Sequence, residues 1–221
     1  MKDFFLSQSR KIIPGIVILL TAIISFAYLG IVMAAPGDLD TTFDSDGIVY
    51  TQAGNTALAD TAHGVAIQSD DKVVVVGEID GDFGVIRYTS TGSLDTTFDT
   101  DGIATMPVST NIDVAEAVVI DSNGKILVAG YSTDSPTAGG VPNAFVVVRF
   151  NANGSLDSGF GTSGKFSSAL GGTVSEAWDI ALDANGKIVV AGTVDDDFAV
   201  ARLTTAGILD TSFDTDGYNT T

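Results

Sequence analysis

One five-residue phrase occurs four times in this chain at nearly regular intervals, and it constrains the fold more than any other feature. Each copy starts with Leu-Asp and ends with Phe, and the copies begin at Leu39, Leu94, Leu156 and Leu209. The spacings between them are 55, 62 and 53 residues. Self-similarity at such a period is typical of repeat architectures, in which each unit packs on its neighbours. We therefore expect a series of equivalent units.

Two further phrases keep the same order inside each unit. A basic residue precedes an Ile/Val/Leu run three times, and a Phe-x-Val-x-Arg stretch follows each run. The basic residues are Lys72, Lys125 and Lys187, and the Phe-x-Val-x-Arg stretches are 83–87, 145–149 and 198–202. The sequence therefore divides into units at about 47–98, 102–160 and 164–213, with a partial unit on either side.

Each unit is expected to contain four short β-strands. In the first unit they are 48–52, 64–68, 72–79 and 83–89, which are rich in β-branched and aromatic residues. Asn-Gly separates the second and third strands in two of the units, which predicts a type I′ hairpin turn. In the first unit Asp71 stands in place of that Gly, so we expect either a strained residue or a different turn type.

The third expected strand of each unit is apolar without alternation, as in Val73–Val76. Such a strand is typical of a sheet that is covered on both faces. Face-to-face packing of four-stranded sheets is how a β-propeller buries its core. The predicted fold is all-β, a propeller-like array of three four-stranded blades that forms a partial or open ring. Closed propellers have about 4 to 8 blades, so three blades leave three alternatives: the reading frame is truncated, a second copy completes the ring, or the array stays open with two apolar faces exposed.

The combined pattern resembles the delta-60 repeat family of bacterial β-propellers. It consists of Leu-Asp-Thr-Thr-Phe-Asp-x-Asp-Gly, then Asn-Gly-Lys before an apolar run that ends in Gly, then Phe-x-Val-x-Arg, and it covers residues 37–217. The resemblance implies an exported propeller-like protein. It implies no catalytic residues, because the family has no assigned function.

The first 34 residues differ in character from the rest. Basic residues precede an uncharged apolar stretch, Ile12–Met33, and small residues follow it. This pattern predicts a secretory signal, although 22 residues is also close to the roughly 20 that span a bilayer as a helix. Residues 1–34 are therefore a signal peptide or a membrane anchor, and 35–221 are expected outside the cytoplasm, secreted or anchored at the cell surface. Contact with a membrane is expected only through 12–33, if they are not cleaved.

The composition of residues 35–221 excludes some classes of function. They hold 7 basic and 27 acidic residues, a net charge of −20. Such a charge repels nucleic acid and anionic lipid, so no nucleic-acid partner is expected. The chain has no Cys, which excludes disulfides and thiolate chemistry.

Six of those seven basic residues are the Lys and Arg of the repeated phrases. A charge that recurs once per unit points to an architectural role. We expect each Arg to form an ion pair with the Asp of a Leu-Asp phrase, because all four copies of that Asp are kept. The expected pairs join Arg87, Arg149 and Arg202 to Asp95, Asp157 and Asp210 or to the preceding copy.

Two Asp residues flank a small residue before Gly in three of the four copies. Alternating Asp before Gly resembles part of a Ca²⁺-binding loop, but it is also the chemistry of a tight turn. The copy at 161–164 lacks both Asp residues, and no further ligand is correctly spaced. The candidate Ca²⁺ ligands are Asp44, Asp46, Asp99, Asp101, Asp214 and Asp216. No other cofactor is expected.

No residue set in the sequence resembles a catalytic centre. His63 is the only His, and no Gly-x-Ser-x-Gly elbow accompanies it. A pair of carboxylates could hydrolyse glycosides, and the acids that lie at or before the second strands are Asp113, Glu116, Glu176 and Asp179. The chain is nevertheless expected not to be an enzyme.

The second unit carries an insertion between its third and fourth strands. Lys125 and Phe145 are 20 residues apart, against 11 in the other units. Insertions in repeat arrays form loops on one face, often the binding face, or tolerated surface loops. The binding-loop candidates are Ser132, Asp134, Pro136 and Asn143.

These features favour a non-catalytic, extracytoplasmic scaffold or interaction module whose partner is an unknown protein or glycan. Two alternatives remain open, a Ca²⁺-dependent adhesive or carbohydrate-binding module and a carboxylate-based glycan hydrolase. A homodimer that completes the ring is a further expectation.

Overall fold

The computed structural model describes residues 37–54, 58–133 and 144–221. The chain divides into two compact parts after Asp40, and the second part, Thr41–Thr221, holds all the sheets. The helix expected within residues 1–34 lies outside the described residues. Among the described residues there is no α-helix, and accordingly none long and apolar enough to cross a bilayer.

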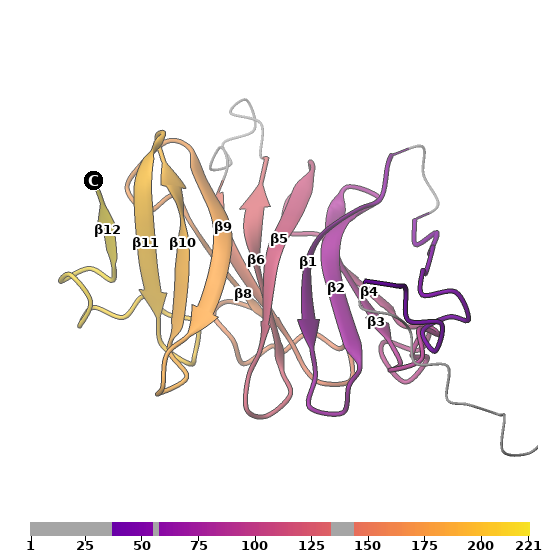
Figure 1. The fold of residues 1–221 in the computed structure, drawn as a ribbon. Coiled ribbons are helices and arrows are strands. Elements are labelled where there is room, and N and C mark those ends of the chain that lie inside the picture. Colours follow the sequence, from indigo (N-terminus) through magenta and orange to yellow (C-terminus); the bar gives the residue numbers. More distant parts are fainter. Residues whose placement is uncertain (1–36, 55–57, 134–143) are drawn as a thin grey trace, which may run out of the picture. The chain divides into compact units, whose positions relative to one another are not determined.

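Twelve strands form three four-stranded antiparallel sheets (Figure 1). The first sheet contains β1 (Thr61–Ile67), β2 (Val73–Ile79), β3 (Asp82–Tyr88) and β4 (Ile103–Met106). The second contains β5 (Asp113–Ile120), β6 (Ile126–Ser132), β7 (Ala144–Phe150) and β8 (Lys165–Ser168). The third contains β9 (Ser175–Leu182), β10 (Ile188–Val194), β11 (Asp197–Leu203) and β12 (Tyr218–Thr220). Within each sheet the strands are neighbours in chain order.

The sheets are shifted along the chain relative to the units expected from the sequence. The strand expected at 48–52 is wrong, because no strand forms there. Each sheet instead takes its fourth strand from the residues that follow the next Leu-Asp phrase, so β4 pairs with β3. Residues 48–52 correspond to β4 in sequence, but no described strand precedes them to pair with. For the same reason β12, expected to belong to a partial flank, completes the third sheet.

The hairpin turns between the first two strands of each sheet also differ from the expected type. A type I′ turn requires positive φ at both central residues, but in each turn only the third loop residue has it. Its φ is 62° at Asp71, 75° at Gly124 and 74° at Gly186. A three-residue loop that ends in a left-handed residue is the next most common hairpin connection. Asp71 therefore adopts the same conformation as the two glycines.

The second sheet explains why the central strands lack alternation. Ile126 and Val128 of β6 pack into a core shared with the first sheet, whereas Leu127 and Ala129 pack into a core shared with the third. Successive side chains of a strand point to opposite faces, so a sheet with a neighbour on each side needs apolar residues at every position. The expected face-to-face packing of sheets is therefore confirmed for the second sheet (Figure 1).

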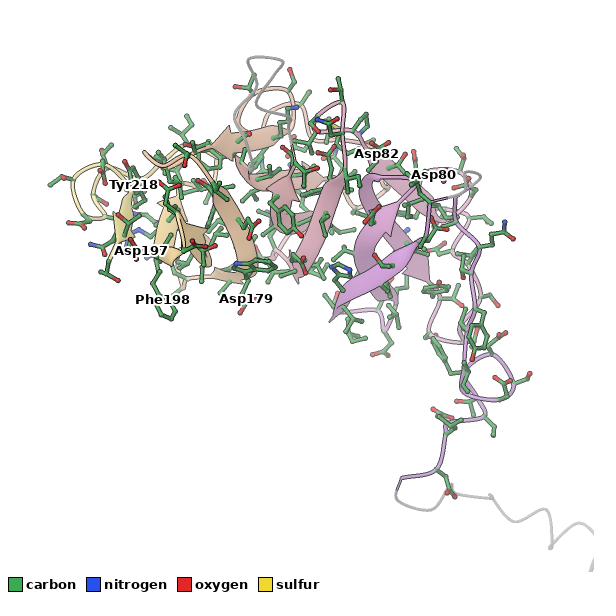
Figure 2. The ribbon with its side chains drawn as sticks, turned by 90° about the horizontal axis from the view of Figure 1, so that it is seen from above. Asp80, Asp82, Asp179, Asp197, Phe198 and Tyr218 are labelled. Carbon is green, nitrogen blue, oxygen red and sulfur yellow. The ribbon has the colours of Figure 1, made fainter. Side chains whose placement is uncertain are left out.

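Within the described part of the chain no sheet packs on either outer face of the array, as expected for three blades. On the first sheet Val65 is 65% exposed, whereas its equivalents Val118 and Ile180 are buried. On the third sheet Phe198 is 81% exposed, and Figure 2 shows its ring projecting away from the ribbon. Each end of the array thus presents apolar side chains to solvent.

Candidate functional site

The Leu-Asp phrases at Leu94, Leu156 and Leu209 each fold back beside the strand that carries the repeated Arg of the unit. Leu94 forms a β-bridge with Tyr88, and the backbone N–H of Asp95 donates to the carbonyl of Arg87 at 2.9 Å. The same bridge and hydrogen bond recur in the other two units. This backbone pairing places the Asp and Arg side chains next to each other at the same edge of every sheet.

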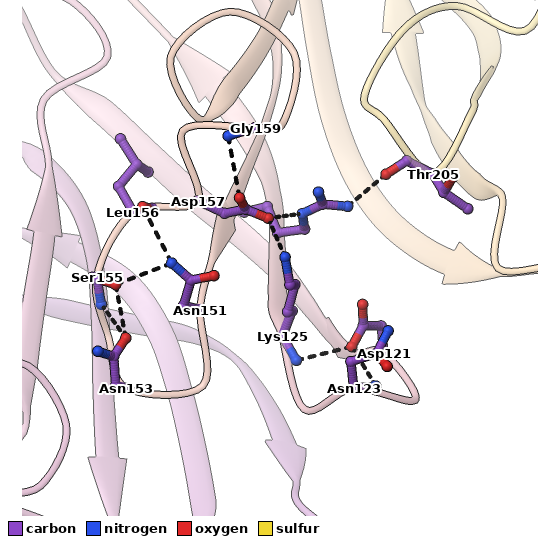
Figure 3. Close-up of polar contacts among 11 residues, drawn as sticks. Asp121, Asn123, Lys125, Asn151, Asn153, Ser155, Leu156, Asp157, Gly159 and Thr205 are labelled. Atoms are coloured by element: carbon purple, nitrogen blue, oxygen red, sulfur yellow. Dashed lines mark hydrogen bonds and ion pairs between the residues drawn. The ribbon is translucent and has the colours of Figure 1, made fainter.

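The Asp, Arg and Lys side chains of each unit form one ion-paired group, which we call the Asp–Arg–Lys cluster. Figure 3 shows the second cluster, in which Asp157 Oδ2 accepts from Arg149 Nε at 2.7 Å and from Lys125 Nζ at 2.6 Å. The other clusters are Asp95 with Arg87 and Lys72, at 2.8 and 3.3 Å, and Asp210 with Arg202 and Lys187, at 2.8 and 2.7 Å. The structure therefore brings each Arg onto the Asp that the sequence analysis paired with it.

The second carboxylate oxygen of each Asp holds the turn that follows it. Asp95 Oδ1 accepts from the backbone N–H of Thr97 at 3.1 Å and from its hydroxyl at 2.6 Å. Ser212 makes the same two bonds to Asp210, and Gly159 makes only the backbone bond to Asp157. Both oxygens of Asp95, Asp157 and Asp210 are therefore engaged, which explains why the Asp is present in these three copies.

Each Arg also contacts an aromatic ring and the following sheet. The guanidinium of Arg149 lies over the ring of Phe160, 4.5 Å from its centroid, and Arg87 and Arg202 lie similarly over Phe98 and Phe213. Arg149 Nη1 donates to the carbonyl of Thr205 in the turn after β11 of the third sheet (Figure 3), and Arg87 Nη1 to that of Ala152 in the turn after β7 of the second, both at 2.5 Å. The clusters therefore tie each sheet to the next.

Three of these partners were missed in the sequence. The Lys was recognised as repeated but was not assigned to the Asp, and neither the Phe nor the carbonyl of the next sheet was considered. The signal for Lys and Phe was present, because both recur once per unit with the Arg. The carbonyl carries no such signal, because Ala152 and Thr205 differ in side chain.

The charges around the clusters change the acidity of the Asp side chains. Burial acts to raise the pKa of Asp95, but the hydrogen bonds from Thr97 and Lys72 and the charge of Arg87 lower it to about 2. The hydrogen bond from Lys125 lowers the pKa of Asp157, and that from Lys187 lowers the pKa of Asp210. The carboxylates are therefore held in the ionised form.

A hollow borders each cluster that has a following sheet. One, of about 580 Å³, is lined by Lys125 and Arg149 of the second sheet and by Asp183 and Asn185 of the third. Another, of about 640 Å³, has Lys72 and Arg87 on its lining in the same relation to the second sheet. Equivalent hollows therefore recur along the edge of the array, with basic residues in an otherwise acidic chain.

The Asp residues that were candidate Ca²⁺ ligands lie in tight turns. Asp46 Oδ1 and Asp101 Oδ1 each accept from the backbone N–H two residues on, at 2.9 Å, and Asp216 does so at 3.2 Å. Asp44, Asp99 and Asp214 have φ between 42° and 47°. Within the described ranges no three His, Asp or Glu side chains converge as metal ligands would. The geometry observed is that of Asx turns.

The titratable residues considered for catalysis each make a different contact. His63 Nδ1 lies 2.9 Å from Glu116 Oε2 on the neighbouring sheet. Asp113 is fully buried, and its Oδ2 accepts from the backbone N–H groups of Val108 and Ser109 at 2.7 and 2.9 Å. Asp179 Oδ1 accepts from the N–H of Ile180 at 2.8 Å. These contacts orient the backbone and neighbouring strands, and Glu176 lies three residues before Asp179 on β9.

One further acid has a perturbed environment. Burial raises the pKa of Asp82, and the charges of Asp113 and Asp80 act in the same direction. Figure 2 shows Asp80 and Asp82 near each other at the end of the β2–β3 hairpin. The sequence analysis did not single out either residue, because acids are frequent throughout the chain.

The insertion of the second unit is described only at its margin. Ser132 ends β6 and is buried, paired in register with Asp113 and Ala144. Asp134, Pro136 and Asn143 lie outside the described residues. The binding role expected for this loop therefore stays a prediction.

Comparison with known protein families agrees with the repeated architecture. Residues 68–98, 122–160 and 184–213 match the family model described as "Domain of unknown function (DUF5122) beta-propeller". Each matched segment runs from the first hairpin turn of a sheet to the Phe of its Asp–Arg–Lys cluster. A search of curated proteins finds no match. Together with the three four-stranded sheets, these matches support a repeated β-propeller domain of unknown function.

Proposed function

We propose that the protein is a non-catalytic scaffold of the delta-60 repeat type, exported or held at the cell surface, that binds a protein or glycan partner. The observation that carries the proposal is the repeated Asp–Arg–Lys cluster with its adjoining hollow. The clusters hold six of the seven basic residues of 35–221, and two of these, Arg87 and Arg149, bond to the following sheet, as a rigid support requires. The hollows give the support equivalent surfaces at regular intervals, which suits recognition of an extended partner.

Export is tested with the full chain carrying a C-terminal epitope in a bacterial host. We expect protease added to intact cells to remove the epitope, because the apolar stretch Ile12–Met33 directs the rest of the chain out of the cytoplasm. An intracellular marker protein that survives the same treatment is the control for cell integrity. An epitope that is cleaved only after lysis would contradict the proposed location.

Binding is tested by applying the purified chain to an array of glycans, with and without a chelator, and by assaying the same glycans for cleavage. A scaffold should bind without releasing products and without needing a metal. Binding lost on chelation would instead identify the Ca²⁺-dependent module, and released sugar would identify a hydrolase.

The site of binding is tested by filling one hollow. Asn123 and Asn185 line the hollow between the second and third sheets. Replacing both with Trp should weaken binding without removing any residue of the cluster. Asn111→Trp is the matched control, because Asn111 precedes β5, at the end opposite to Asn123, and does not line this hollow. Equal binding by both variants would exclude the hollow as the recognition surface.

A further inference from the structure

The two internal junctions of the array follow one rule. Phe83 of the first sheet packs against Gly130 of the second, and Phe145 of the second packs against Gly192 of the third. A Cβ at either Gly would approach the Phe ring to 2.9 and 2.7 Å. Both Phe side chains are fully buried. Each sheet therefore inserts one aromatic ring over a glycine of the sheet that follows it.

The third sheet carries the inserting half of this junction, and nothing among the described residues receives it. Phe198 is the equivalent of Phe83 and Phe145, and its ring stands free of the ribbon (Figure 2). Arg202 makes the bonds of its own cluster, to Asp210 and Ser212. Among the described residues, none provides the following-sheet carbonyl that Arg87 and Arg149 contact.

The first sheet carries the receiving half. Gly77 is the equivalent of Gly130 and Gly192, but a Cβ there would first meet Thr61 and Ala62, with no inserted Phe ring as at the internal junctions. A pocket of about 210 Å³ lies there instead, lined by Gly77, Val75 and Ile86. Val65 and Ile67 of the same face are 65% and 60% exposed. The free face of the first sheet is thus shaped like the faces that receive Phe83 and Phe145.

Residues 41–54, which we call the tail, cover part of this receiving face. The backbone N–H of Asp44 donates to the carbonyl of Thr91 at 2.9 Å. Asp99 makes the same bond to Asn153, and Gly161 to Ala206, across the internal junctions. Val49 and Tyr50 of the tail line the pocket beside Gly77. The tail therefore sits where a preceding sheet would place its own turn.

Residues 39–50, which include most of the tail, are equivalent in sequence to 209–220, and the two segments cannot both occupy this seat. Residues 209–220 are held by the Asp210 ion pairs with Arg202 and Lys187 and by the pairing of β12 with β11. The tail forms no strand, and its hydrogen bonds to the first sheet include those of Asp44 to Thr91 and of Thr51 to Tyr88, at 2.7 Å. Because the tail has the weaker attachment, it is the segment that yields.

We propose that a second copy of this chain docks head-to-tail on the first sheet, with its Phe198 in the pocket beside Gly77 and with the tail displaced. The same junction formed twice closes a ring of two chains and six sheets, which is within the range of about 4 to 8 blades for propellers. The occupant is a second copy because the docking half and the receiving half are both present in one chain and match its internal junctions.

The first test is the mass in solution of the full chain, measured by sedimentation over a range of concentrations. We expect a species of two chains, and Phe198→Asp should reduce it to one because a carboxylate would enter an apolar pocket. Ile208→Asp is the matched control, since Ile208 is also exposed but lies in the connection after β11, beside Gly161 and Phe166. This variant should remain a dimer. Circular dichroism checks that both variants are folded.

A second variant should act in the opposite direction. Asp44→Pro removes the N–H that bonds Thr91 and cannot adopt the φ of 46° found there. Freeing the tail should strengthen the dimer by up to about tenfold, the contribution of one hydrogen bond.

Since the chain has no Cys, a His63→Cys/Asp179→Cys double variant should also form an intermolecular disulfide on oxidation. Asp179 is equivalent in position to Gly64 and His63 to Glu116, and Gly64 lies against Glu116 at the first internal junction.

The outcomes separate this proposal from the scaffold function. A monomer at all concentrations, or a polymer without a fixed size, would overturn the two-chain ring. A dimer unaffected by Phe198→Asp would show that another surface is responsible. None of these masses depends on export or on a ligand, so the ring can fail while the proposed function holds, and the reverse.

Discussion

At the residue scale, the three Asp–Arg–Lys clusters share a geometry but differ in burial. The side chains of Arg87, Arg149 and Arg202 are 5%, 13% and 23% exposed. The order follows the array, because the last Arg has no following sheet among the described residues. An ion pair contributes little in water and becomes sensitive to the loss of one partner when it is buried. Equivalent substitutions should therefore have graded effects.

We predict that replacing each Arg with Ala lowers the free energy of unfolding, most at Arg87, less at Arg149 and least at Arg202. The loss at Arg87 should be about 3–5 kcal/mol, because Asp95 is left as a buried charge with a weaker partner. Urea unfolding measures the three values. Lys165→Ala is the control, since this Lys is outside the repeated phrases and bonds one carbonyl, that of Val108. Equal effects at all four positions would contradict the structural role of the clusters.

The ionisation of Asp95 predicts a dependence of stability on pH. The pKa of this carboxyl is lowered from 3.8 to about 2 in the folded chain. A lowered pKa contributes stability that is fully present above the unfolded pKa and is lost as the pH falls toward the folded value. Between pH 4 and pH 2 we expect a loss on the order of 2 kcal/mol from this group.

The measurement is urea unfolding at several pH values across that range. Asp95→Asn cannot titrate, so its free energy of unfolding should start lower at neutral pH and fall less between pH 4 and pH 2 than that of the native sequence. Parallel curves for the two proteins would show that Asp95 is not held in the ionised form by its neighbours.

At the scale of single elements, the first hairpin turn departs from its two equivalents. Asp71 has the left-handed conformation that glycine adopts without strain, with φ of 62°. We predict that Asp71→Gly raises the free energy of unfolding by about 1 kcal/mol, because the strain of a non-glycine residue is removed. Thermal unfolding at fixed pH measures the change.

The second hairpin supplies a matched reverse substitution. A Cβ at Gly124 would meet Ala152 at 3.7 Å, an ordinary contact, so Gly124→Asp introduces the strain without a clash. It should destabilise the chain by a similar amount. If both substitutions changed stability in the same direction, the conformation of the turn would not be the cause.

Much of each sheet could be predicted from its sequence, and the errors have physical reasons. The strands β1, β2 and β3 lie within a few residues of their expected positions, because apolar runs between turn residues specify them locally. The fourth strand of each sheet was expected to be the first strand of the following unit. A short edge strand forms only where a partner strand is available. Sequence alone does not show that Ile103–Met106 pairs with β3, which precedes it in the chain, or that 48–52 has no described strand to pair with.

The candidate site was predicted in part for a similar reason. The pairing of Arg149 with Asp157 could be anticipated because both residues recur together. The contact of Arg149 with the carbonyl of Thr205 could not, since any residue supplies a carbonyl. Contacts through the backbone of a neighbouring sheet leave no trace in residue identity.

At the scale of the whole molecule, stability depends on apolar stacking that opposes a large like-sign charge. The net charge is −18, and most acidic side chains are spread over the surface. Like charges that are forced together in the folded state lower its stability. The ion pairs act the other way, but the Asp side chains of all three clusters are at most 13% exposed, and buried pairs are screened less by salt than surface charges.

Screening should therefore relieve more repulsion than it removes attraction. We predict that the unfolding temperature rises as NaCl is added up to about 0.15 M, where the Debye length falls to about 8 Å. The measurement is thermal unfolding of dilute protein, with Phe198→Asp as the control, because a rise that persists in this variant cannot come from association of chains. A falling unfolding temperature would mean that exposed ion pairs, rather than repulsion among the acids, dominate the electrostatics of the array.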